Sequence, residues 1–165
     1  MNRQTIRTRQ IVDWSAAFWS GLVAGSIFYL SSLFVLPHLV GGNAWIILRM
    51  FASVLLGESI LAPPATFDLG AFLAGAGLHL ALSVLLTLLL ALIIHRWGLL
   101  VGFLGGAMFG LAVYAIHMYT LTLWLPWFYI LEGTPFAVLH MIFGALAGLV
   151  YEALEVEEFV PVNES

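Results

Sequence analysis

The chain has no cysteine and no lysine, and only 8% of its 165 residues are charged. Without cysteine it has no disulfide, no thiolate metal ligand, no iron–sulfur cluster and no cysteine nucleophile. Soluble domains carry about 25% charged residues, so the composition excludes a water-soluble domain. The five positive charges, all arginine, are too few to form a basic surface, which excludes a nucleic-acid partner.

Long apolar runs are what the sequence has instead. A membrane-spanning helix needs about 20 apolar residues, and four stretches reach that length. The first ends without a small-residue cleavage site and is too long for a signal peptide, so we keep it as a span. The pattern predicts an all-α, polytopic membrane protein, a four-transmembrane-helix bundle forming one domain over 1–165. The predicted spans are 14–36, 70–94, 99–124 and 136–154.

A shorter apolar segment, residues 44–57, lies between the first two spans. It is too short to cross a bilayer and too apolar to stay in water, which predicts an interfacial or re-entrant helix. Arg49 lies within it and must reach water or find a carboxylate. We expect a structural ion pair of Arg49 with Glu58 or Asp68, with Glu132 as a third candidate. Anion binding and simple exposure are the alternatives.

The arginines are distributed unevenly between the two sets of loops. Positive residues favour the cytoplasmic side of a membrane, and four of the five arginines lie before the first span or between the second and third. This pattern predicts a bacterial cell inner membrane with both termini and the acidic tail 155–165 in the cytoplasm. The four arginines are Arg3, Arg7, Arg9 and Arg96.

Small residues recur at spacings of three to four in every span. Helices in lipid associate through small residues that allow their backbones to approach closely. The stripes therefore predict the faces that point into the bundle, and they suit docking with other membrane subunits or self-association. The glycines expected to pack helices are Gly21, Gly25, Gly75, Gly102, Gly106, Gly110, Gly144 and Gly148.

Three histidines, His79, His117 and His140, lie inside the apolar spans on the faces that carry the small residues. An ionisable residue within a membrane span is a functional-site hypothesis by default. At a rise of about 1.5 Å per residue, their depths from the outer ends of the spans agree within roughly 5 Å. The sequence therefore predicts a histidine layer near the outer side.

This histidine layer has two interpretations. Imidazoles ligate metals, and histidines on neighbouring helices clamp haem; Glu58 or Glu132 would complete a transition-metal site. Alternatively, each histidine is structural and bonds to a serine or carbonyl across a helix interface. Without a readable catalytic triad or phosphate loop, the sequence does not favour an enzyme.

Several motifs carry a resemblance to a known family. The chain resembles an uncharacterised family of small four-helix bacterial inner-membrane proteins, for which the name sodium:proline symporter is sometimes used. The resemblance covers nearly the whole chain from the first span onward and implies a four-span inner-membrane protein. The motifs are RM at 49–50, LG at 56–57, LAPPATFD at 61–68, LHLALS at 78–83 and the region 140–151.

These observations favour a non-catalytic integral membrane subunit or accessory protein, for example of a respiratory or photosynthetic complex. Its partners would be the bilayer and other subunits or further copies of the chain. A haem- or metal-binding protein using His79, His117 and His140 is the alternative. The third possibility is passage of ions or small solutes through an oligomer.

Overall fold

The computed structural model describes residues 8–95, 97–156 and 158–161. Arg3, Arg7, Arg96 and part of the acidic tail lie outside them. Within the described residues, four helices are long and apolar enough to cross a membrane, which confirms the all-α fold class. They are α1 (Trp14–Phe34), α4 (Leu69–Ile94), α5 (Gly98–Tyr119), whose apolar run continues through η2 (Leu121–Leu123), and α6 (Thr134–Leu154).

Polar residues at the helix starts fix where the helices begin. The carboxylate of Asp13 accepts the backbone N–H of Ala16 at 2.9 Å before α1, and that of Asp68 accepts the N–H of Ala71 at 2.7 Å before α4. These side chains satisfy amide groups that have no partner within the helix. In α6 a proline occupies the first turn, where no backbone donor is needed.

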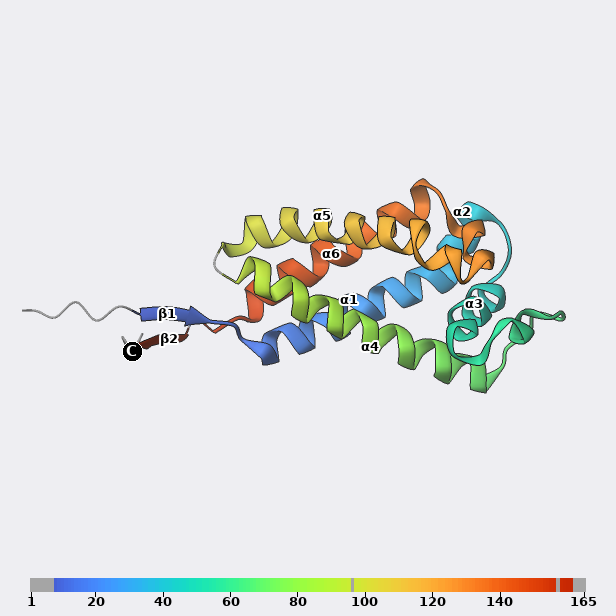
Figure 1. The fold of residues 1–165 in the computed structure, drawn as a ribbon, viewed down its shortest axis with the longest axis horizontal. Coiled ribbons are helices and arrows are strands. Elements are labelled where there is room, and N and C mark those ends of the chain that lie inside the picture. The colour runs from blue at the N-terminus through green and yellow to red at the C-terminus, as the bar shows by residue number, and fades with distance from the viewer. Residues whose placement is uncertain (1–7, 96, 157, 162–165) are drawn as a thin grey trace, which may run out of the picture.

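The four spans pack in the order α5, α6, α1, α4. Each helix in this series packs along the next, but α4 and α5 have few contacts with each other. They follow directly in sequence, since α4 ends at Ile94 and α5 begins at Gly98, and the N–H of Trp97 donates to the carbonyl of Ile94 at 3.0 Å, as in a turn. Figure 1 shows the two helices diverging from this turn toward the opposite end of the bundle. The bundle is therefore open between α4 and α5.

The two ends of the bundle differ (Figure 1). The turn end carries the α4–α5 turn and a short antiparallel pair of β1 (Thr8–Ile11) and β2 (Glu158–Pro161), which the sequence did not predict. The α3 end carries the predicted apolar loop helix, α3 (Ala44–Leu56), which packs mainly on α4. The other short helices at this end are α2 (Leu36–Val40), η1 (Glu58–Leu61) and η3 (Pro126–Leu131).

Glycine brings α5 and α6 into backbone contact. A Cβ atom added to Gly106 would overlap the carbonyl of Gly144, and one added to Gly110 would overlap the carbonyl of His140. A Cβ on Gly102 would lie 2.9 Å from the carbonyl oxygen of Gly148. Only residues without side chains permit such an approach.

Glycine also brings α4 close to α1 and α3. A Cβ on Gly21 would lie 2.7 Å from the Cα of Val84, and one on Gly25 would lie 2.5 Å from the Cβ of Ser83. A Cβ on Gly75 would lie 3.2 Å from the backbone nitrogen of Ala52 in α3. All eight glycines expected to pack helices therefore lie at close helix approaches.

Candidate functional site

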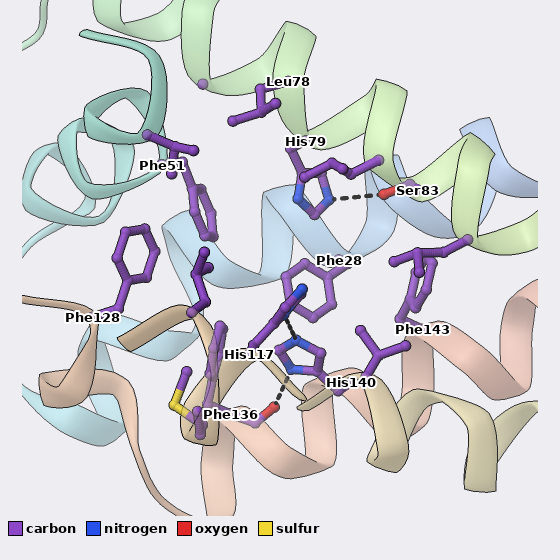
Figure 2. A pocket seen from close by; sticks show the side chains of 17 residues that line it. Phe28, Phe51, Leu78, His79, Ser83, His117, Phe128, Phe136, His140 and Phe143 are labelled. Carbon is purple, nitrogen blue, oxygen red and sulfur yellow. Dashed lines mark hydrogen bonds between the residues drawn. The ribbon is translucent and has the colours of Figure 1, made fainter. Parts of the chain in front are cut away.

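A cavity of about 260 Å³ lies between α4 and α5 in the α3 half of the bundle (Figure 2). We call it the α4–α5 cavity. Helices α1 and α6 form its floor, while α3 and η3 border it toward the α3 end. Its wall is mainly aromatic and aliphatic, and the histidines supply most of its polar atoms. The aromatic side chains in the wall are Phe28, Phe51, Phe128, Phe136 and Phe143, and the histidines are His79, His117 and His140.

His79 on α4 is bonded to α1. Its Nε2 lies 3.1 Å from the carbonyl oxygen of Gly25 and 3.3 Å from the hydroxyl of Ser83. Because a carbonyl only accepts, Nε2 carries the hydrogen and donates it. In the uncharged ring, Nδ1 of His79 is then an acceptor with a free lone pair.

His117 and His140 form a second, directed pair. The Nδ1 of His140 lies 2.8 Å from the carbonyl oxygen of Phe136, so it donates and leaves Nε2 as an acceptor. The Nδ1 of His117 lies 3.1 Å from that Nε2 and must donate to it. The remaining nitrogen, Nε2 of His117, is therefore also an acceptor. Figure 2 shows it at the end of the ring that points toward His79.

Aromatic packing holds these rings in place. Phe28 stacks on His79 with ring centres 5.1 Å apart and meets His140 edge-on at 4.8 Å. Phe51 also stacks on His79, with ring centres 5.6 Å apart, and Phe136 meets His140 edge-on at 4.5 Å. Such pairs favour defined orientations. The two acceptor nitrogens, His79 Nδ1 and His117 Nε2, are thus fixed, and neither has a hydrogen-bond partner among the described residues.

The structure does not bring Glu58 and Glu132 to the histidines. Glu58 lies in η1 and Glu132 follows η3, and both are exposed at the α3 end. In the described part of the chain, no three His, Asp or Glu side chains are grouped so that they could hold a metal ion. His140 is also occupied at both nitrogens. The predicted transition-metal site, in which Glu58 or Glu132 would join the three histidines, is therefore not formed among the described residues.

Arg49 is bonded to backbone rather than to a carboxylate. Its guanidinium donates to the carbonyl oxygens of Ile60 at 3.0 Å, Ala62 at 3.3 Å and Thr66 at 3.2 Å. The predicted ion pair with Glu58 or Asp68 is wrong for the residues described. The irregular segment after α3 has carbonyls with no helical partner, and the guanidinium, with five donors, satisfies them. Asp68 is used instead to cap α4.

The aromatic wall of the cavity was not anticipated. In an apolar span, a phenylalanine facing the interior looks the same in sequence as one facing lipid. A signal was nevertheless present on α4, where small and polar residues recur with the helical period around His79. The α4 residues lining the cavity are Gly75, Leu78, His79, Leu82, Ser83 and Leu86.

No protein-family model, curated protein or solved structure matches the chain. The family resemblance seen in the sequence therefore stays a prediction.

Proposed function

We propose that this protein binds a small lipophilic molecule, which enters the α4–α5 cavity sideways from the bilayer. The observation that carries the proposal is the opening between α4 and α5, two membrane spans that follow each other in sequence but diverge around a histidine-lined space (Figures 1 and 2). Tight packing of these helices would have left no such space.

The cavity opens at a depth where the outer surface of the helices contacts lipid. Leu82 lines the cavity, is 42% exposed and lies near the middle of α4, so its surroundings in a membrane are acyl chains. Val54 on α3 lines the cavity and is 37% exposed. A ligand reaching these side chains must first dissolve in the bilayer.

The chemistry of the wall supports ligand binding. Binding sites for small molecules are mainly apolar and aromatic, with a few well-placed polar groups, and this cavity has that composition. Its 260 Å³ is slightly below the roughly 300–1,000 Å³ of drug-sized pockets. It therefore suits a single ring, or the head of a longer molecule whose tail stays among the lipids.

The membrane and orientation belong to the same proposal. We infer a bacterial inner membrane with the termini in the cytoplasm, supported by the arginine distribution. The described parts of both termini and the α4–α5 turn lie at one end of the bundle, as this topology requires (Figure 1). The cavity then lies in the periplasmic half.

Photolabelling in lipid nanodiscs tests the proposal. A trifluoromethyl-phenyldiazirine, a small lipophilic aromatic, should label cavity residues such as Met118 and Leu82 saturably, as located by mass spectrometry. Val113→Phe fills the cavity and should abolish this labelling, because Val113 is buried in its wall. Ile116→Phe is the matched control on α5, since Ile116 is 60% exposed and does not line the cavity. Labelling that is unsaturable and insensitive to Val113→Phe would refute the proposal.

A further inference from the structure

We infer that the ligand head carries a hydroxyl that donates hydrogen bonds, and that it is a lipophilic phenol-class ring. This inference rests on the proposed function and adds the chemical class of its ligand. It follows from the directions of the hydrogen bonds around the cavity, which leave two acceptors facing the space, His79 Nδ1 and His117 Nε2.

Every ring N–H in the cavity is already used. His79 donates to the Gly25 carbonyl, His117 to His140, and His140 to the Phe136 carbonyl. Both series of hydrogen bonds end on a backbone carbonyl, which can only accept. In the uncharged rings the hydrogen therefore cannot move to the other nitrogen without breaking these bonds. The cavity therefore presents lone pairs.

Ser83 is the only hydroxyl among the residues of the cavity wall, and it does not change this result. It is 3% exposed and packs against Gly25, where a Cβ would lie 2.6 Å from its Oγ. The Oγ contacts His79 Nε2, the nitrogen that already donates to Gly25. A ligand that only accepts, such as an ether or a ketone, would leave its oxygen facing the two imidazole lone pairs. A hydroxyl on the ligand satisfies one of these lone pairs.

The aromatic wall favours a ring as the carrier of the hydroxyl. Phe28 and Phe51 both stack on His79, and Phe136 stands edge-on to His140, so flat faces and ring edges line the space. Aromatic ligands match such surfaces by stacked and edge-on contacts. The tail of the molecule would leave between α4 and α5, where Leu82 is exposed.

Two probes that differ in a single hydrogen-bond donor, the phenolic O–H, test the inference. 4-Nonylphenol and its methyl ether, 4-nonylanisole, are compared as competitors of the diazirine label in nanodiscs, at equal mole fractions in the bilayer. We expect the phenol to compete at about ten-fold lower concentration, the effect of one hydrogen bond to an otherwise unsatisfied buried group. Labelling of the Val113→Phe variant sets the non-specific background.

Three substitutions connect the preference to the nitrogens. His79→Leu removes Nδ1 without adding an amide oxygen, which would itself accept a hydrogen bond. His117→Leu together with His140→Leu removes Nε2 of His117 and also the acceptor on His140 that the loss of His117 alone would expose. The triple variant should bind the phenol and the anisole with equal affinity. In the unmodified protein, ¹⁵N-histidine spectra should show His79 Nδ1 or His117 Nε2 shifting with the phenol alone.

The outcomes separate the two proposals. If both probes compete equally well in the unmodified protein, lipid-side binding stands and the donor requirement is overturned. If the phenol preference survives in the triple variant, the assignment to these nitrogens is overturned. Stoichiometric zinc or copper in the purified protein would also overturn it, because the lone pairs would then be ligands. If neither probe competes and the diazirine itself labels without saturation, the proposed function fails as well.

Discussion

The half of the bundle near the α4–α5 turn, which we call the turn half, differs from the half near α3 in what the same helix faces carry. These faces carry glycines in the turn half and aromatic or imidazole rings in the α3 half. In the turn half, Gly106 of α5 and Gly144 of α6 place two backbones in contact. One turn nearer the α3 end, the same face of α6 carries His140 in place of a glycine. On α5 the series passes Gly110 and reaches His117. On α5 and α6 the series of glycines thus ends where the cavity begins.

Helix α1 shows the same change. Gly25 lies against α4, and Phe28, less than one turn further on, lines the cavity. Three helices therefore exchange glycine for a ring at a similar depth. The rings that replace glycine line the space between α4 and α5, two helices with few contacts, whereas α5 and α6 stay in backbone contact at Gly110 and His140. The glycine seams keep helix backbones in the remaining part of the bundle in close contact.

The largest effect should come from breaking the glycine seam. Gly106→Ala adds a Cβ that overlaps the Gly144 carbonyl, so α5 and α6 must separate. We expect a loss of about 3 kcal/mol or more, the upper range for overpacking. Thermal unfolding in detergent, followed by circular dichroism, measures it. Gly77→Ala is the matched control, because a Cβ there meets nothing within 4 Å. Equal melting of the two variants would contradict the seam.

The next effect concerns residues 58–68, the segment between α3 and α4. Arg49→Met retains an apolar stem but leaves the carbonyls of Ile60, Ala62 and Thr66 without their donor. We expect a cost of about 2 kcal/mol, within the range for hydrogen bonds to charged groups. Hydrogen exchange in residues 58–68 should rise, while exchange in α5 and α6 stays constant. Unchanged exchange in residues 58–68 would show that Arg49 does not hold this segment.

The sequence was sufficient for the helices and their small-residue faces. Apolar length alone located the four spans and α3, since a membrane imposes a minimum length that few other structures require. The close approach of each glycine follows from the spacing of the stripes. The roles as an accessory subunit, a haem protein or an ion pathway stay predictions.

The partners of the polar side chains could not be predicted in the same way. Arg49 had carboxylates nearby in sequence, yet it bonds to carbonyls released by the irregular segment after α3, and that segment's path was not readable. The cavity was also invisible, because it depends on α4 and α5 diverging after a tight turn. Hydropathy indicates which segments lie in the bilayer but not which neighbouring helix a given side chain faces.

The smallest predicted effect compares a glycine seam with one that uses a hydroxyl. Ser20 of α1 is fully buried and donates to the carbonyl of Ala147 in α6 at 2.6 Å. Hydrogen bonds between membrane helices average about 0.6 kcal/mol, so Ser20→Ala should lower the stability by about that amount in the same melting experiment. Ser20→Gly, which also removes the hydroxyl, should cost about 1 kcal/mol more, because glycine is a poor helix former. A loss for Ser20→Ala as large as that for Gly106→Ala would mean that the hydroxyl bond, not backbone contact, holds the closed half together.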